Sequence, residues 1–459
     1  MEIVKIFNKN ALFFPLLVLI AGLGIFRWKS ERARDYYQFW VVGQAIKSME
    51  LTNIYSAQDR QRIGQHFLDQ AIAQKASPSH LRAASERRVI EPAGSPFLYS
   101  VFLLFSTGQY DFDYEVFRIL SSLAYILSIV ILCHMLQVPR LLTLVLIILL
   151  TDFFDPFLRD MLEGNVNQLQ FGIIAFILWL RARNGKNGNE IAAGAILGLL
   201  IMFKPNLALL LVFLFMGTFL VKSIRRILLF AGGVGMGIGC GLGLPLLLFG
   251  KVGNWAQWWT SLPQMVLTQK YTKRSFLGIL FGVEDSVPYY LLMLFLVVCP
   301  FLIILKSKIK AKIRQQGESK IGFSSEYDLP LDLLMIGLAV TVYLLSSPLV
   351  HFHYFTLIVP FLLFVLRPSR STYSFLHKNE WKRILLGCIA FLLFDIRVYR
   401  SGYPGAGIFL TYWPCAYAST ILLYAYGILQ LKRLVEAPAA YWADDSTFPS
   451  GAAEASDHG

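Results

Sequence analysis

The sequence predicts an all-α polytopic membrane protein, and its composition and the arrangement of its apolar residues lead to that fold class. Of 459 residues, 56% are hydrophobic and only 15% are charged, against about 25% charged residues in an ordinary soluble domain. The apolar residues form uninterrupted runs such as 227–249 and 289–305, without the alternation of a half-buried strand. These runs indicate membrane-spanning helices, because a helix satisfies its own backbone hydrogen bonds in lipid.

Twelve apolar runs are candidate membrane spans. The first follows Lys5 and Lys9 as the core of a signal peptide would, but it lacks a clear small-residue cleavage site, so we expect an uncleaved first helix. The run 97–106 is too short for a helical span, and we expect a re-entrant or interfacial segment on the outer face. The expected spans cover approximately residues 11–26, 116–134, 138–154, 169–181, 191–203, 207–221, 227–249, 289–305, 331–347, 354–366, 384–396 and 415–431.

Basic residues gather in the short connections between runs, and this distribution predicts the topology. Short loops rich in Lys and Arg are expected on the cytoplasmic side, and twelve spans then place both termini inside the plasma membrane. The long loop 27–115 lies outside, where its basic residues are tolerated because long loops translocate largely regardless of charge. We expect one membrane domain over residues 1–433 and a disordered cytoplasmic tail over 434–459. The basic loops are 181–190, 222–226, 306–314, 367–383 and 432–433.

Neither the net charge nor the cysteines point to another functional class. A net charge of +13 would suggest nucleic acid in a soluble protein. Here the basic residues lie in the loops, which fix topology, and we expect no nucleic-acid partner. The five cysteines lie in or beside apolar runs and form no CxxC or Cys/His cluster, so the sequence suggests neither disulfides nor a metal site.

The loop after the first span contains a predicted amphipathic helix. Ser56 is a candidate N-cap, with Asp59 three residues on, close to the capping-box pattern. Ile63, Phe67, Leu68 and Ile72 then fall near one helical face. The helix is expected either to lie on the membrane surface or to pack on the protein itself.

Polar segments emerge mainly at the outer ends of the predicted spans. A transporter would be expected to place ionisable residues near the middle of its helices. The pattern here favours an active site at the outer membrane–water boundary, which would take a lipid-linked substrate from the bilayer and a second substrate from outside. The segments are Asp35 with its two tyrosines, 155–168, 204–206, 255–274, 346–353 and 395–400.

Four of these segments, in the same order, resemble integral-membrane glycosyltransferases that use polyprenyl-phosphate sugars. The nearest group is glycosyltransferase family 87, of the GT-C fold, with the mycobacterial polyprenol-phosphate-mannose-dependent α-1,2-mannosyltransferases. Asn165 stands where that group usually has Gln, and the usual Trp before the histidines is missing. The matching segments are DYYQFW from Asp35 with Gly43 and Ile54-Tyr55, GNVNQ from Gly164, GLLIMFKP from Gly198, and Ser347-Pro348 with His351 and His353.

The resemblance implies a GT-C-like bundle and an inverting transfer of mannose, or a related hexose or pentose, outside the cytoplasm. The donor would be a polyprenyl-phosphate sugar, the acceptor a hydroxyl of a lipid- or glycan-linked partner, and no cofactor or metal is expected. Asp35 matches the family's catalytic carboxylate and is the candidate base. The alternative is a solvated loop carboxylate paired with Arg32 or Arg34. A non-enzymatic lipid or glycan transporter or flippase is the alternative function.

The remaining candidate site residues would contact the donor phosphate or the sugars. Lys204 is a charge partner for the phosphate or a snorkelling lysine. Arg159 shares that role or pairs with Asp160 or Glu163. His351 and His353 would face the same side if their segment is extended, and suit phosphate or acceptor binding. The expected substrate-binding residues, which could equally cap and pack helices, are Tyr36, Tyr37, Glu163, Asn165, Asn167 and Gln168.

Three other motifs carry weaker alternatives. Asp111-Phe112-Asp113 is a DxD, which binds a metal-diphosphate in nucleotide-sugar transferases, but those enzymes need a soluble α/β domain that the sequence does not predict. Trp255, Trp258 and Trp259 lack the following Asp of the oligosaccharyltransferase signature, so an interfacial aromatic belt is favoured. Asp395, Arg397 and Arg400 are expected to form an ion pair.

Overall fold

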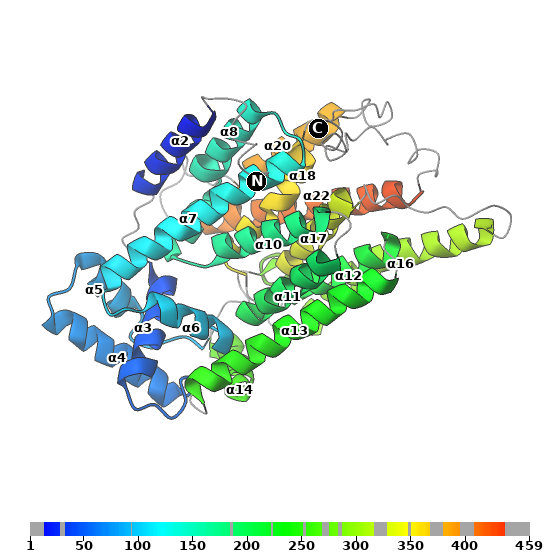
Figure 1. The fold of residues 1–459 in the computed structure, drawn as a ribbon. Coiled ribbons are helices and arrows are strands. Elements are labelled where there is room, and N and C mark those ends of the chain that lie inside the picture. The colour runs from blue at the N-terminus through cyan, green and yellow to red at the C-terminus, as the bar shows by residue number, and fades with distance from the viewer. Residues whose placement is uncertain are drawn as a thin grey trace, which may run out of the picture.

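The computed structural model describes residues 13–27, 33–92, 94–183, 187–221, 224–250, 254–268, 275–282, 287–315, 328–347, 350–367, 380–394 and 408–436. Every regular element in these ranges is helical, and none of the described residues forms a strand. The all-α class predicted from the apolar runs is therefore confirmed. Figure 1 shows long, roughly aligned helices that form an extended body, with a group of shorter helices at one end.

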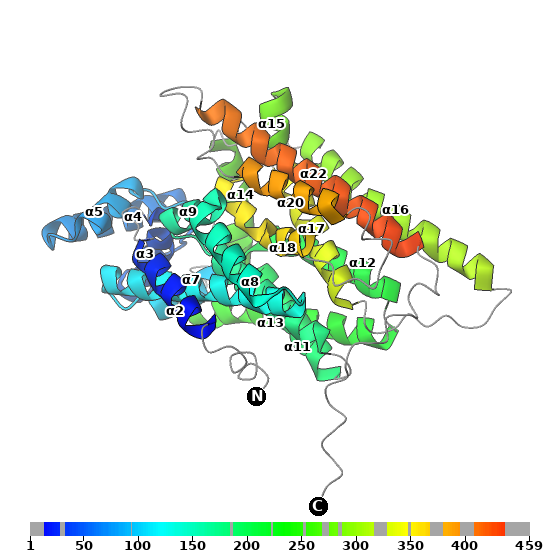
Figure 2. The same ribbon diagram turned by 90° about the horizontal axis from the view of Figure 1, so that it is seen from above.

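The shorter helices form a unit that we call the loop cap, residues 33–105. Figures 1 and 2 show it at one end of the helical body. Its own apolar core includes Tyr37, Trp40, Phe67 and Tyr99, all nearly inaccessible. The cap consists of α3 (Arg34–Ser48), α4 (Ala57–Ala73), α5 (Pro78–Glu86), α6 (Pro96–Phe102) and the short 3-10 helix η1 (Leu103–Phe105).

The body is built around α17 (Asp328–Ser346), whose side chains from Leu331 to Leu345 are almost all buried. Apart from α14, the other helices of the body contribute to the larger apolar core. They are α2 (Phe13–Arg27), α7 (Tyr110–Met135), α8 (Arg140–Ile148), η2 (Leu149–Phe153), α9 (Asp155–Glu163), α10 (Asn167–Ala182), α11 (Asn187–Phe203), η3 (Pro205–Leu207), α12 (Ala208–Val221), α13 (Ile224–Phe249), α14 (Trp255–Thr268), α15 (Phe276–Phe281), α16 (Val287–Gln315), η6 (Phe352–Ile358), α18 (Val359–Leu366), α20 (Glu380–Phe394) and α22 (Ile408–Glu436).

Four of the described helices are long and apolar enough to cross a membrane. A fifth candidate is a bent pair, Arg140–Phe153 with Asp155–Glu163, whose axes differ by 56°. Shorter apolar helices account for further predicted spans, so the structure supports a membrane protein, while the number twelve stays a prediction. The four long candidates are Tyr110–Met135, Ile224–Phe249, Val287–Lys306 and Leu329–Ser346.

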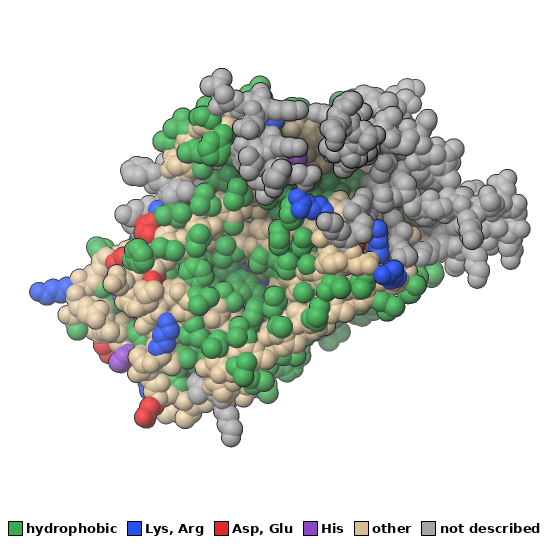
Figure 3. Space-filling view, in the orientation of Figure 1, with side chains coloured by type: hydrophobic (Ala, Val, Ile, Leu, Met, Phe, Trp, Pro, Cys, Tyr) green, Lys and Arg blue, Asp and Glu red, His purple; other side chains and the backbone are tan. Residues whose placement is uncertain are grey.

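The surface in Figure 3 fits a membrane-embedded body. Charged side chains gather over the loop cap at one end, and further Lys and Arg side chains lie toward the opposite helix ends. Between them, hydrophobic side chains cover the long helices. Leu247, 85% exposed, and Leu291, 61% exposed, are examples of large apolar side chains that no described part of the protein covers. Lipid is the solvent in which such a surface carries no hydrophobic penalty.

The helix α11, which ends at the site, packs unusually closely on α13 because both carry glycines at the contact. A Cβ at Gly194 would lie 2.2 Å from the carbonyl oxygen of Phe230, and one at Gly198 would lie 2.4 Å from that of Val234. On α13, a Cβ at Gly233 would lie 2.2 Å from the carbonyl oxygen of Ile191 on α11. Small residues let two helix backbones approach in this manner, so the glycine-rich run before Lys204 is a packing surface.

Two expectations for the loop cap have clear outcomes. Ser56 caps α4 as predicted, with its Oγ accepting a 3.0 Å hydrogen bond from the backbone N–H of Asp59. Ile63, Phe67 and Leu68 are buried inside the cap, so protein covers this part of the predicted apolar face, whereas Ile72 is 59% exposed. The segment 97–106 forms α6 and η1, whose combined ten residues remain shorter than a span.

The structure tests only part of what the sequence predicts for the C-terminal region. Helix α22 continues to Glu436, so residues 434–436 are helical and not part of a disordered tail. Leu434 and Val435 pack partly against the body core, which explains why the helix extends this far. The rest of the predicted tail, 437–459, and the predicted ion pair of Asp395, Arg397 and Arg400 lie outside the described residues.

Candidate active site

Asp35 lies in the first turn of α3, where the loop cap meets the body. Ala33, the N-cap, adopts the left-handed conformation with φ of 37° and donates its N–H to the carbonyl oxygen of Leu162 at 3.1 Å. A left-handed alanine is unfavourable by about 1–3 kcal/mol, so the surrounding contacts hold it. Gly164 ends α9 with φ of 65°, and a Cβ there would lie 2.8 Å from the Cβ of Tyr36. The end of α9 thus abuts the start of α3.

The carboxylate of Asp35 is held by one donor from each side of this junction. Its Oδ1 accepts from Nη2 of Arg87 at 2.6 Å, and its Oδ2 accepts from Nδ2 of Asn165 at 2.7 Å. The side chain is 17% exposed. Arg34 is instead paired with Glu163, so Asp35 is neither a solvated loop carboxylate nor the partner of Arg34, while Arg32 lies outside the described residues.

Opposing effects act on the ionisation of Asp35. Burial raises its pKa, while the positive charge of Arg87, and with smaller weight charges at His353, His351 and Arg34, lower it. The net result is a pKa well below the ordinary range of an aspartate. Asp35 is therefore an anion at any physiological pH.

Asn165 joins Asp35 to the only lysine of this cluster. Its Oδ1 accepts from Nζ of Lys204 at 3.0 Å, and its Nδ2, which donates to Asp35, is also 3.1 Å from Nε2 of His353. The ammonium of Lys204 has only donors and the ionised Asp35 only acceptors, so these two neighbours determine which way the amide points. Asn165 therefore links a fixed anion to a fixed cation.

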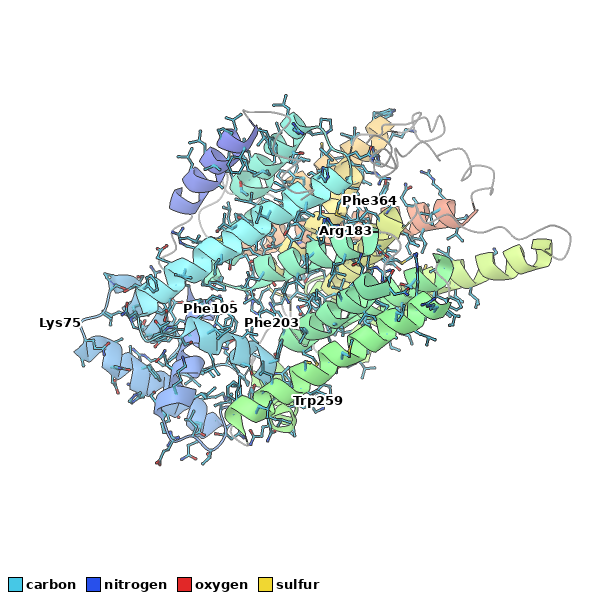
Figure 4. All side chains as sticks on the ribbon, viewed as in Figure 1. Lys75, Phe105, Arg183, Phe203, Trp259 and Phe364 are labelled. Atoms are coloured by element: carbon cyan, nitrogen blue, oxygen red, sulfur yellow. The ribbon has the colours of Figure 1, made fainter. Side chains whose placement is uncertain are left out.

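Lys204 reaches the cluster because α11 ends at Phe203, directly before it, and Pro205 follows. Its backbone is extended, with φ of −147°, and its Nζ also bonds Oδ1 of Asn167 at 3.0 Å. The same Nζ lies 4.4 Å from the centre of the Tyr354 ring. Asn167 in turn donates to Asp160 at 2.6 Å. Lys204 thus points into the protein and does not snorkel. Figure 4 labels its neighbour Phe203, where α11 meets α6.

The two histidines lie on the same side, although only His351 is extended and His353 lies in the 3-10 helix η6. His351 has extended backbone angles, φ −101° and ψ 147°. The His351 and His353 rings are stacked, with centroids 5.3 Å apart and planes 6° from parallel. His353 is buried, and its backbone oxygen accepts from Nδ2 of Asn167 at 3.2 Å. The histidines therefore border the Asn165–Lys204 network.

Several predicted site residues lie outside this hydrogen-bond network. Arg159 is 38% exposed and pairs with Asp155 at 3.5 Å. The Tyr36 hydroxyl donates to the carbonyl oxygen of Phe105, in an aromatic cluster inside the loop cap. Tyr37 is also fully buried in the cap, and Gln168 is buried at the start of α10. The contacts described for these four residues are structural, and their substrate-binding role stays a prediction.

The sequence reasoning missed three residues of the cluster. Arg87 binds Asp35 from the end of α5, Tyr354 covers the Lys204 ammonium, and Asp160 holds Asn167. Arg87 carries no sequence signal because it lies between other charged residues of a long loop, 52 positions from Asp35. The cue for Tyr354 was its position directly after the His-Phe-His segment.

Both carboxylates of the DxD motif accept hydrogen bonds from other residues of the protein, and the sequence had already made a metal-diphosphate site the weaker alternative. The Asp113 carboxylate accepts from Nε1 of Trp40 at 2.8 Å and from Thr107. The Asp111 carboxylate accepts from Oγ of Ser77 at 2.7 Å. Among the described residues, no three His, Cys, Asp or Glu side chains gather as they would around a metal ion. Of the three tryptophans, Trp259 is 69% exposed, while Trp258 is buried in the cap core.

This arrangement suits group transfer between two oxygen atoms. A fixed carboxylate can take a proton from a hydroxyl, and a nearby ammonium and two imidazoles can stabilise negative charge on a leaving group. Both functions come together at the junction between the cap and the body.

Comparison with known proteins gives one match. The model of glycosyltransferase family 87 matches residues 94–314, which run from the end of the loop cap through α16. This range contains Asn165, Asn167 and Lys204, while Asp35 and the two histidines lie on either side of it. Neither the curated proteins nor the solved structures yield a match. This match, the all-helical fold and the several apolar helices together indicate a membrane glycosyltransferase that is similar to family 87.

Proposed function

We propose that this glycosyltransferase moves mannose, or a related hexose or pentose, from a polyprenyl phosphate to a hydroxyl of a lipid- or glycan-linked acceptor. The reaction takes place on the extracytoplasmic side of the plasma membrane and inverts the anomeric configuration. The observation that carries the proposal is the linked pair of Asp35 and Lys204, an anion and a cation joined through Asn165. These are the two charges that such a transfer needs.

Asp35 acts as the base in this proposal. The acceptor oxygen bonds to the anomeric carbon, the bond from that carbon to the phosphate oxygen breaks, and the phosphate leaves with the electron pair. The acceptor proton passes to Asp35. A carboxylate with a lowered pKa is a weak base toward a free hydroxyl, but the hydroxyl becomes strongly acidic once its oxygen bonds to carbon. A late proton transfer, with an oxocarbenium-like transition state, therefore suits this site.

Lys204 stabilises the leaving phosphate. Its ammonium is held between Asn165 and Asn167, so it needs little reorganisation when negative charge develops. His351 and His353 lie on the same side and offer further donors. Glu163, Asn165, Asn167 and Gln168 lie at the α9–α10 junction, close enough in sequence to contribute to the sugar site.

The direct test is transfer by the purified full-length protein. We expect polyprenyl-phosphate mannose and a lipid-linked acceptor to give a glycosylated product, detected by mass spectrometry. Asp35→Asn should lower the rate on the order of 10²–10⁴-fold, the usual contribution of a general base, because the amide cannot take the proton. Transfer by this variant at the wild-type rate would refute the assignment of the base. Movement of the lipid across vesicles without a new glycosidic bond would favour the transporter instead.

A further inference from the structure

We propose that Arg87 is a positioning residue for this reaction, which fixes the orientation of the Asp35 carboxylate. The inference rests on the proposed function, because it concerns the base of that reaction. Arg87 lies outside the range that the family model matches. It is therefore assigned here from its contacts alone.

Arg87 is bound in three directions. Its Nη2 binds Asp35 at 2.6 Å, its Nη1 binds Glu91 at 2.5 Å, and its Nε donates to the carbonyl oxygen of Arg34 at 3.3 Å. Its side chain is only 9% exposed. A planar guanidinium can make these three bonds at once, whereas the ammonium of a lysine is a point charge on a flexible stem. The geometry therefore fixes both the position of the charge and its direction toward Asp35.

The loop cap holds the segment that carries Arg87. Helix α5 begins at Ser77, whose Oγ accepts from the N–H of His80, and Arg87 is its C-cap. Helix α4 packs directly on the backbone after it, because a Cβ at Gly64 would lie 2.1 Å from the carbonyl oxygen of Arg88. Nη1 of Arg60 on α4 also donates to the carbonyl oxygen of Ile90 at 3.2 Å, and the N–H of Ile90 donates to the carbonyl oxygen of Arg60 at 3.3 Å. Helices α4 and α5 thus act as a scaffold that presents Arg87 to the site.

Arg87 is the strongest positive influence among the groups that face Asp35. Burial raises the pKa of Asp35, and Arg87 is the first of the charges that oppose it. Without Arg87, only the smaller effects of His353, His351 and Arg34 would oppose the effect of burial on the pKa of Asp35. The other charged or titratable groups around Asp35 are Arg34 on α3, Asp160 and Glu163 on α9, Lys204 after α11, and His351 and His353 before and in η6.

The test compares Arg87→Gln with the wild type in pH–rate profiles of sugar transfer. The wild type should keep its activity well into the acid range, because Arg87 and the neighbouring cations hold the pKa of Asp35 below the usual range of an aspartate. In the variant the acid limb should move upward by about 1–3 pH units, the usual effect of one adjacent opposite charge on an aspartate. At the optimal pH we expect kcat to fall by roughly 10²-fold through misplacement of the base, with KM for the donor nearly unchanged.

Two variants separate positioning from a general loss of structure. Arg82→Gln removes a 44% exposed arginine of the same helix, paired with Glu86, and should leave the profile as in the wild type. Compared with Arg87→Gln, Arg87→Lys should return the acid limb much closer to its wild-type position, because it keeps the positive charge. It should restore less of kcat, because it loses the planar guanidinium that makes three bonds at once. An unshifted acid limb in folded, purified Arg87→Gln would overturn the inference.

A second measurement distinguishes this inference from the proposed function. Thermal unfolding of the wild type, Asp35→Asn, Arg87→Gln and the double variant forms a cycle that needs no activity. We expect the double variant to lose clearly less than the sum of the two single losses. If the wild type transfers no sugar, the proposed function fails while the cycle still reports the contact. If the wild type transfers sugar and the losses are additive, the assigned role of Arg87 fails alone.

Discussion

At the scale of single residues, Asn165 connects three functional groups of the site. One amide binds the proposed base, the proposed phosphate contact and a buried histidine ring. Its neighbours are charged, and hydrogen bonds to charged groups contribute about 1.5–3 kcal/mol each. Replacing Asn165 would therefore release Asp35 on one side and Lys204 on the other.

We predict that Asn165→Ala lowers kcat of sugar transfer on the order of 10²-fold, with a smaller effect on KM. The physical reason is lost orientation of two catalytic charges, since a displacement of about 1 Å can have this effect. Steady-state kinetics of the purified variant measure it. Asn189→Ala is the matched control, because this amide lies in the first turn of α11 and donates to the backbone oxygen of Arg183 at 3.0 Å. A kcat of Asn165→Ala within twofold of the wild type would contradict the linking role.

At the scale of elements, a second buried ion cluster ties four helices together. Arg181 on α10 binds Asp332 on α17 through two bonds of 2.6 and 3.0 Å. It also binds Glu190 on α11 at 3.3 Å and Thr218 on α12 at 3.0 Å. All four side chains are buried. The sequence placed Arg181 at the edge of a basic loop, but its described contacts make it a structural residue.

We predict that Arg181→Met destabilises the protein by about 3–5 kcal/mol, because it leaves two buried carboxylates without their cation. Thermal unfolding in detergent should show a large drop in the midpoint temperature. Arg183→Met is the control: Arg183 is exposed and stacks over Trp179 at 3.7 Å, an interaction of roughly 0.5–1 kcal/mol. Equal midpoints for the two variants would show that the cluster contributes little to stability.

At the scale of the whole molecule, the loop cap and the ends of α10 and α12 lie at opposite ends of the helical body. Figure 4 labels Lys75 in the cap and Arg183 far from it, just after α10. The predicted topology puts the cap outside the cell and Arg183 in the cytoplasm. Because both regions are exposed, their sides can be tested without disturbing the buried site.

We predict that a cysteine at position 74, next to Lys75, reacts with a membrane-impermeant maleimide on intact cells. A cysteine at position 183 should react only after the membrane is permeabilised. Both substitutions, Gln74→Cys and Arg183→Cys, belong in a background without the five native cysteines. The reverse labelling pattern would place Asp35 on the cytoplasmic side and would refute an extracytoplasmic active site.

Local sequence features account for the elements of this protein. The long apolar runs determine that the chain is helical and membrane-embedded, because lipid leaves the backbone few alternatives. Ser56 determines the start of α4, and Pro205 ends α11 so that Lys204 can turn inward. The segments containing Asp35, Asn165 and Lys204 also pointed to the family. Each of these conclusions depends on residues within a few positions of one another.

Only the tertiary structure decides which charges meet. Arg87 and Asp35 are 52 residues apart, Asn165 and His353 are 188 apart, and Arg181 and Asp332 are 151 apart. No local pattern encodes such pairs, because they arise when whole helices pack and bury the side chains together. For the same reason the burial of Tyr36 and Tyr37 in the core of the loop cap is visible only in the tertiary structure, while their substrate-binding role stays a prediction. The sequence alone therefore determined the elements and the family, and the packing of the cap on the body determined the partners of Asp35.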